Sequence, residues 1–242
     1  GPLAETWGWQ PIMHLTAVVC ILAVVTVWLG YRPPPGSKTS TGGRMGFHMP
    51  RRELKMVLYA GLVWTVYNLA YFSIISFGPA LLLERGLDVA AAGAAISLAS
   101  WAALPALPLG GYLADRTGRP DLVLGISCIL AAGAAALLPM TDHPYLLCAI
   151  VGLFAAAPAG LIMGRAISLM SPPHRAQGNA ILYTFFYGGM GLIPSVVGWG
   201  ADVTGTAATP LYFSASALLL SVPLFLVLHA MASRLSVERA AV

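Results

Sequence analysis

The stretch Gly111-Tyr112-Leu113-Ala114-Asp115-Arg116-Thr117-Gly118-Arg119-Pro120-Asp121 lies between two long apolar runs and decides the fold class of this chain. Two carboxylates and two guanidinium groups fall within it, whereas charged residues make up only 9% of the chain. Because hydrocarbon does not tolerate such a cluster, we expect a turn at which two membrane spans meet water. Residues 111–121 are called the signature turn below.

The composition indicates an all-α polytopic membrane protein. Hydrophobic residues make up 58% of the 242 residues, and the 13 basic and 9 acidic side chains are too few to cover a water-soluble globule. The net charge of +4 does not indicate nucleic acid binding, because the basic residues are dispersed among short loops. The three cysteines lie in apolar runs without metal-ligand spacing, so neither a metal nor a cofactor is expected.

Apolar runs of about 20 residues, each enough for one crossing, predict seven transmembrane helices. A break is expected in the second at Gly78-Pro79, and kinks are expected at Pro105 and Pro108 in the third and at Pro158 in the fifth. The predicted spans are 11–31, 54–83, 89–112, 122–140, 145–170, 177–200 and 209–231.

Residues 32–53 are the one long hydrophilic connection, rich in Pro, Gly, Ser and Thr, and read as a flexible linker. If this linker lies in the cytoplasm, all 13 basic residues except Arg85 outside and Arg165 within a span fall on the cytoplasmic side. The amino end of the chain is then expected outside and the carboxyl end inside.

The signature turn also reveals a repeat. Gly111-x-x-Ala114-Asp115-x-x-Gly118 recurs as Gly198-x-x-Ala201-Asp202-x-x-Gly205, and again as Gly1-x-x-Ala4-Glu5-x-x-Gly8. Three copies of G-x-x-A-[D/E]-x-x-G, each at or just after the end of an apolar segment, predict duplication of a multi-helix unit.

The signature turn closely resembles the loop motif G-x-L-[A/S]-D-[R/K]-x-G-[R/K]-[R/K] of the major facilitator superfamily of secondary transporters, departing from it at Pro120. Members usually have two six-helix bundles joined by a long cytoplasmic loop, with a weaker copy of the motif after the eighth helix. The order of spans here matches that second copy, so the resemblance covers family helices six to twelve. It implies an outer loop and last helix of the amino-terminal bundle at 1–31, the inter-bundle linker at 32–53 and the carboxyl-terminal six-helix bundle at 54–242.

The resemblance also implies the function. The chain is expected to be the carboxyl-terminal half of a secondary active transporter that moves a small organic solute across the cytoplasmic membrane by alternating access. Its expected partners are the bilayer, the solute with or without a coupling ion, and the amino-terminal bundle of the same protein. The alternative is a transporter-like receptor, or a half-length unit that acts with a partner chain.

In the family this loop acts as a latch that holds one access state. Carried over residue by residue, the expected cytoplasmic gate consists of Gly111, Asp115, Arg116, Gly118 and Arg119. A carboxylate here suits the positive amino end of a neighbouring helix, and the arginines suit acids or phospholipid headgroups. The competing interpretation is a solvated loop that follows the positive-inside rule.

A candidate substrate cavity follows from polar and aromatic residues within the spans. Helical spacing places the candidates of the second span on one face, where they suit a small organic molecule, although an interfacial aromatic belt or helix packing would also explain them. Arg165 either faces this cavity, which would favour an anionic solute, or extends toward the cytoplasmic headgroups. The candidates are Trp64, Tyr67, Asn68, Tyr71, Arg165, Tyr183 and Tyr187.

The sequence does not indicate an enzyme. It contains no Ser/His/Asp grouping, paired buried carboxylates, HExxH or phosphate-binding loop. No Asp or Glu is expected inside the six spans after the linker, so this part of the chain supplies no carboxylate proton relay. His14 and His229 lie near span ends with no partner evident from the sequence.

Overall fold

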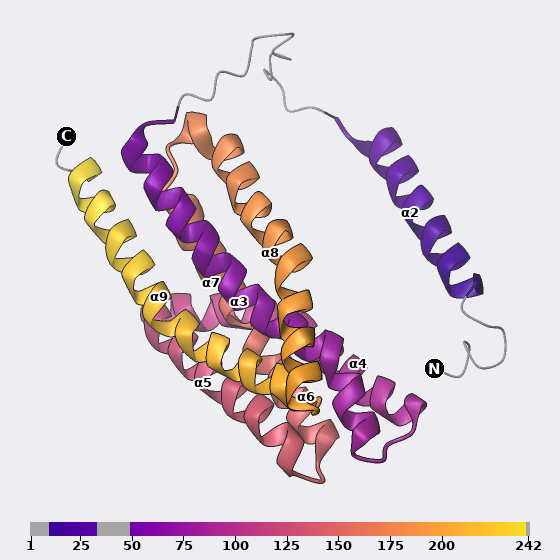
Figure 1. The fold of residues 1–242 in the computed structure, drawn as a ribbon. Helices are drawn as coiled ribbons and strands as arrows, with labels where there is room; N and C mark the ends of the chain where they lie inside the picture. The colour runs from indigo at the N-terminus through magenta and orange to yellow at the C-terminus, as the bar shows by residue number, and fades with distance from the viewer. Residues whose placement is uncertain (1–9, 33–48, 241–242) are drawn as a thin grey trace. The chain divides into compact units, whose positions relative to one another are not determined.

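The computed structural model describes residues 10–32 and 49–240, and all regular structure in these ranges is helical (Figure 1). The chain divides into two units, Gly1–His48 and Met49–Val242, which are described separately. In the first unit, α2 (Gln10–Gly30) is an apolar helix of 21 residues. Its length suffices for one membrane crossing.

The second unit is a bundle of long helices joined by short turns. A glycine with positive φ or a proline in the first helical turn marks most of these junctions. The elements are α3 (Arg51–Glu84), α4 (Val89–Thr117), α5 (Pro120–Leu137), η1 (Leu138–Met140), α6 (Pro144–Ala156), α7 (Pro158–Ser168), η2 (Pro172–His174), α8 (Arg175–Thr204) and α9 (Thr209–Ala240).

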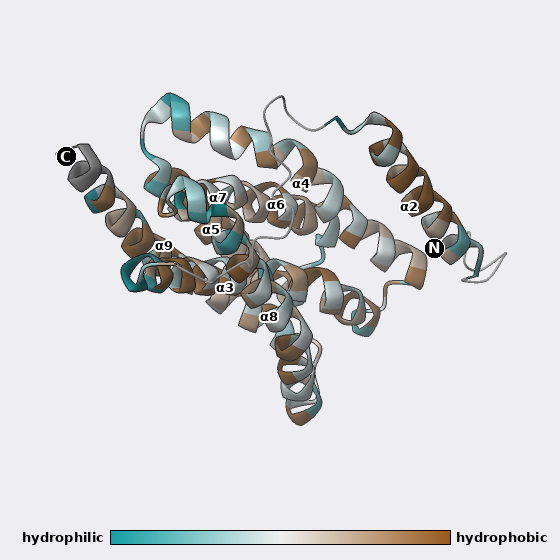
Figure 2. Cartoon of the chain, turned by 90° about the horizontal axis from the view of Figure 1, so that it is seen from above, coloured by the Kyte–Doolittle hydropathy of each residue, from teal (hydrophilic) through white to brown (hydrophobic). Residues whose placement is uncertain are grey.

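Seven helical segments in the described ranges are long and apolar enough to cross a membrane, with α6 and α7 together forming one of them. Apolar residues run along the helices, and hydrophilic residues gather mainly near turns and helix ends (Figure 2). The prediction of an all-α polytopic membrane protein with seven spans is confirmed.

The prolines differ in how they affect their helices. α3 continues through Pro79, and α4 continues through Pro105 and Pro108, so the expected break at Gly78-Pro79 is wrong. Only Pro158 interrupts its span, where α6 ends and α7 begins. A proline removes one backbone hydrogen bond, and a membrane helix within a bundle tolerates this loss when neighbouring groups compensate.

The core of the bundle lies where α3 packs against α4, α8 and α9, and where α4 and α5 pack against α6. Two glycines allow the closest approach of backbones. A Cβ atom at Gly110 would overlap the carbonyl of Ala157, and one at Gly152 would overlap the carbonyl of Ala99. Small residues therefore bring α4 against α6 and α7, as in membrane helix packing generally.

Contacts between loops define the two ends of the bundle. At the end of the bundle that holds the signature turn, called the signature end below, the start of α3 meets the turn between α7 and α8 through Glu53 and Ser171. At the opposite end, Arg85 after α3 pairs with Asp142 before α6 at 2.9 Å. The signature turn and the last turn of α7 line one pocket, which places both at the signature end.

Candidate functional site

Local backbone geometry shapes the signature turn. Gly118 ends α4 in the left-handed conformation at φ 65°, and its N–H donates to the carbonyl of Ala114 at 2.9 Å. The Thr117 hydroxyl donates to the carbonyl of Leu113 at 2.7 Å, and Pro120 starts α5. Glycine at the C-cap and proline at the first helical position are typical of a sharp helix–turn–helix junction.

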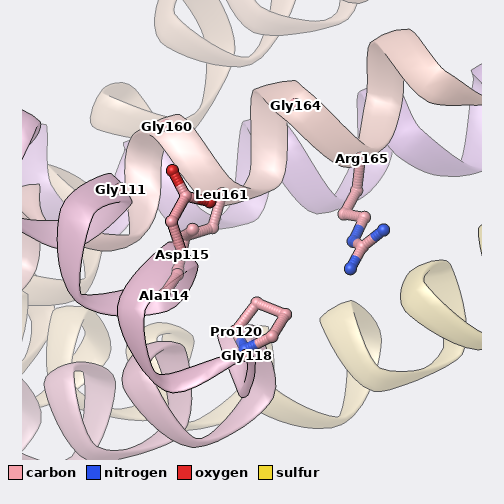
Figure 3. Close-up of a pocket in the computed structure, with 9 residues that line it drawn as sticks. All are labelled: Gly111, Ala114, Asp115, Gly118, Pro120, Gly160, Leu161, Gly164 and Arg165. Atoms are coloured by element: carbon pink, nitrogen blue, oxygen red, sulfur yellow. The ribbon is translucent and has the colours of Figure 1, made fainter.

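This turn forms one wall of a pocket of about 560 Å³, shown in Figure 3. The opposite wall belongs to α7, whose glycines at 160 and 164 leave space beside its backbone. The carboxylate of Asp115 points toward α7, and the Arg165 guanidinium projects from the last turn of α7 on the other side of the pocket (Figure 3). The full lining is Gly111, Ala114, Asp115, Gly118, Pro120, Gly160, Leu161, Gly164 and Arg165.

Asp115 and Arg165, both within the described ranges, share this pocket without forming an ion pair. The helix that carries Arg165 ends at Ser168, earlier than the predicted span, so this residue lies about one helical turn from the helix end. The sequence left Arg165 between the substrate cavity and the cytoplasmic headgroups, and in the structure it lines the pocket of the signature turn.

The predicted gate residues divide into two groups. Gly111, Asp115 and Gly118 line the pocket. Arg116 and Arg119 are exposed and are not part of the lining. The Arg116 guanidinium donates to the Tyr112 hydroxyl at 2.9 Å along the surface of α4, where basic side chains are well placed for anionic headgroups.

The second copy of the repeat builds a similar feature at the opposite end. Gly205 ends α8 with φ 67°, and its N–H donates to the carbonyl of Ala201 at 2.8 Å. The first, fourth, fifth and eighth residues of this copy, Gly198, Ala201, Asp202 and Gly205, line a pocket together with Glu84. The corresponding four positions of the signature turn line the first pocket. The copy at residues 1–8 lies outside the described residues.

A hydrogen-bonded group around one buried carboxylate lies at the signature end and was not predicted from the sequence. Glu53 is only 8% exposed and accepts a hydrogen bond from the backbone N–H of Ser171 at 2.6 Å. The Ser171 hydroxyl lies 3.0 Å from Glu53 Oε1, and His174 Nδ1 lies 2.8 Å from Glu53 Oε2. These contacts tie the start of α3 to the turn between α7 and α8.

This cluster is not a hydrolytic triad. His174 Nδ1 contacts both Ser171 Oγ at 2.9 Å and Glu53 Oε2 at 2.8 Å. A triad needs the two ring nitrogens to serve different partners, so that one can take the serine proton while the acid orients the other. The only sequence signal was the spacing of Ser171 and His174, because Glu53 is more than 100 residues away.

The structure places His229 beside Asp121, a neighbour that the sequence did not reveal, although the two facing atoms do not meet with hydrogen-bond geometry. Its Nδ1 lies 2.9 Å from Asp121 Oδ1 at the start of α5. The His229 ring also packs edge-on against Phe225, with centroids 6.2 Å apart. This proximity brings α9 beside the last residue of the signature turn.

The aromatic candidates of α3 and α8 lie together, although not all on one surface. The ring centroids of Trp64 in α3 and Phe186 in α8 lie 6.3 Å apart, and Tyr183 stacks on Tyr187 with ring centroids 6.1 Å apart. Tyr67 is only 2% exposed, and its hydroxyl donates to the carbonyl of Ala155 in α6. Tyr67 therefore lies inside the bundle, while Tyr183 and Tyr187 remain exposed.

The remaining cavity candidates, Asn68 and Tyr71, are half-buried beside this aromatic group. Asn68 Nδ2 donates to the Trp64 carbonyl at 2.8 Å. This bond occupies one of the amide's two N–H groups and leaves its carbonyl oxygen for another partner. Tyr71 faces Ser100 of α4.

Comparison with known families agrees with this architecture. Residues 63–240 match the sequence profile described as the Major Facilitator Superfamily. The match covers most of the chain, so the chain belongs to this family of membrane transporters. No curated protein matches it. The protein is therefore an integral membrane protein, and it belongs to a family whose members are transporters rather than enzymes.

Proposed function

We propose that this chain forms the carboxyl-terminal half of a secondary active transporter that moves a small organic solute across the cytoplasmic membrane by alternating access. The observation that carries the proposal is the pocket where Asp115, the left-handed turn at Gly118 and Arg165 come together at one end of the bundle. In this proposal the signature end faces the cytoplasm, which places most basic residues on that side.

The pocket supplies the parts of a reversible latch. Asp115 and Arg165 lie on different helices, so movement of the α4–α5 turn relative to α7 alters their separation. A charged pair of this kind has different energies in two arrangements, and such differences bias a two-state equilibrium. The amino-terminal bundle is the proposed partner, because the positive amino end of a helix would favour the Asp115 carboxylate.

The solute is proposed to bind the exposed surface formed by α3 and α8. This surface lies nearer the middle of the helices than the latch does. Trp64, Asn68, Tyr71, Tyr183 and Tyr187 supply aromatic surface and neutral polar groups there. Membrane sites for small organic molecules combine such apolar walls with a few polar groups. A coupling ion that needs a carboxylate in the membrane interior would find it outside α3–α9, whose interior stretches lack Asp and Glu.

The test is uptake by vesicles reconstituted with the native full-length polypeptide, using solutes found by a thermal-shift screen. Asp115→Asn keeps the size of the side chain and removes its charge. We expect uptake to slow about tenfold, equivalent to about 1.4 kcal/mol in the barrier, with the solute Kd unchanged. Arg165→Lys should slow uptake in the same way, because a compact ammonium does not reproduce a guanidinium.

Asp142→Asn is the matched control, since this exposed carboxylate lies at the opposite end of the bundle. Uptake that is unchanged in Asp115→Asn would contradict the latch. Solute binding by the wild-type protein without uptake would contradict the transporter proposal and support a receptor.

A further inference from the structure

Six aromatic rings form a continuous surface on α3 and α8. Phe186 is the centre of this surface, because its ring centroid lies 6.3 Å from that of Trp64, 6.0 Å from that of Phe72 and 5.0 Å from that of Tyr187. The group, called the aromatic wall below, consists of Trp64, Tyr71, Phe72, Tyr183, Phe186 and Tyr187.

The wall is open on the side of α8. Tyr183 and Tyr187 are 45% and 64% exposed, and α8 buries only Gly178, Leu182 and Val197 along its 30 residues. Tyr183 lies eight residues, about 12 Å, along α8 from Arg175, and Tyr187 lies about 18 Å along it. With Arg175 at the cytoplasmic interface, as the proposed function has it, these hydroxyl groups lie deeper than an interfacial aromatic belt, where lipid offers no hydrogen-bond partner. Their depth favours a hydrated cavity.

The helices that carry the wall contain no charged residue near it. In α3 none occurs between Lys55 and Glu84, and in α8 none occurs between Arg175 and Asp202. Arg165 lines the pocket of the signature turn and is not a member of the wall. An anion on the wall would therefore lose its hydration without gaining a cationic partner from these two helices, which is costly at membrane depth.

A cation meets the opposite situation. The faces of aromatic rings carry partial negative charge, and a cation held over them gains about 0.5–1 kcal/mol when exposed and about 2 when desolvated. The tyrosine hydroxyls and the amide of Asn68 are neutral, and their oxygen lone pairs can face a positive charge. The wall thus attracts positive charge without a carboxylate, provided that the charge is spread over a large apolar body.

We propose that the aromatic wall binds a lipophilic organic cation, with delocalised positive charge on an aromatic or quaternary body. This inference rests on the proposed function, because it takes the wall as the lining of the solute cavity. It replaces the expectation of an anionic solute, which depended on Arg165 facing that cavity.

The experiment uses two probes of nearly equal size and opposite charge, tetraphenylphosphonium and tetraphenylborate, with the native full-length polypeptide in detergent. Binding is measured by equilibrium dialysis for the wild type and for the double variant Tyr183→Leu/Tyr187→Leu. The site-specific signal is the binding to the wild type minus the binding to the double variant. This subtraction removes the probe that partitions into the detergent micelle. Loss of two ring faces should weaken tetraphenylphosphonium binding about five- to thirtyfold and leave tetraphenylborate binding unchanged.

Two further variants separate ring chemistry from misfolding. Tyr183→Phe/Tyr187→Phe keeps both rings and should retain cation binding within about twofold. Tyr212→Leu removes an exposed tyrosine of α9 outside the wall and should have no effect on either probe.

Site-specific binding of tetraphenylborate that equals or exceeds that of tetraphenylphosphonium would overturn the inference. So would a double leucine variant that binds both probes like the wild type. The proposed function fails separately: uptake that still depends on Asp115 while the wall ignores cations leaves the transporter proposal standing, and an Asp115→Asn variant with normal uptake contradicts the latch alone.

Discussion

Removing the Glu53 carboxylate should destabilise the bundle more than removing any exposed acid. Glu53 is 8% exposed, and its oxygens face the Ser171 N–H at 2.6 Å, the Ser171 hydroxyl at 3.0 Å and His174 Nδ1 at 2.8 Å. A hydrogen bond to a charged group contributes about 1.5–3 kcal/mol, and members of one network do not add independently. For Glu53→Ala we therefore expect a loss of about 2–4 kcal/mol in unfolding free energy.

The assay is denaturant unfolding of the purified protein in detergent, followed by circular dichroism. Asp142→Ala is the matched control, because its carboxylate pairs with Arg85 at 2.9 Å while the side chain is 96% exposed. Exposed pairs of this kind contribute about 0–1 kcal/mol. Glu53→Gln should fall between the two, since the amide oxygen still accepts from the Ser171 N–H but carries no charge.

A double-mutant cycle tests whether the contacts in the structure cause the effect. Glu53→Ala and His174→Ala together should be less destabilising than the sum of the single changes by about 1 kcal/mol. Equal losses for Glu53→Ala and Asp142→Ala, or additive effects of Glu53→Ala and His174→Ala, would refute the reasoning.

Two further predictions concern glycines, and both are measured by the same unfolding assay. Gly152→Val places side-chain atoms against the backbone of Ala99 and should lower the unfolding free energy by about 3 kcal/mol or more. The control Gly93→Val has nothing within 4 Å of its Cβ position and should lower it by less than about 1 kcal/mol. Equal losses would show that the helices do not cross closely at Gly152. Gly118→Ala places a Cβ in the left-handed region at φ 65° and should lower the unfolding free energy by about 1–2 kcal/mol. Gly111→Ala, inside the adjoining helix, should be neutral or stabilising. A neutral Gly118→Ala would contradict the left-handed turn.

The fold class could be predicted from the sequence because hydrophobic length is a local property. A run such as that of α9 is apolar over enough residues to cross a bilayer whichever neighbours it has. The turn at Gly118 was also local, since the glycine, the following proline and the adjacent charges define the end of one helix and the start of the next. The repeat aligns Gly205 with Gly118, and the φ of 67° at Gly205 is close to the 65° at Gly118.

The break expected at Gly78-Pro79 does not occur. Pro79, Pro105 and Pro108 stay inside continuous helices, whereas Pro158 separates α6 from α7. Each proline removes the same N–H group, so the residue alone does not distinguish the cases. The outcome depends on the packing around each position.

The sequence by itself determined the seven spans, the sharp signature turn and the positions of the charges, because each depends on neighbouring residues in the chain. Only the tertiary structure decided which side chains share a site. It placed Arg165 with Asp115, buried Tyr67 against α6, and brought Glu53 to His174 across more than 100 residues. These relations depend on the rotation of each helix about its axis and on which helices are neighbours, and both are set by packing of the whole bundle.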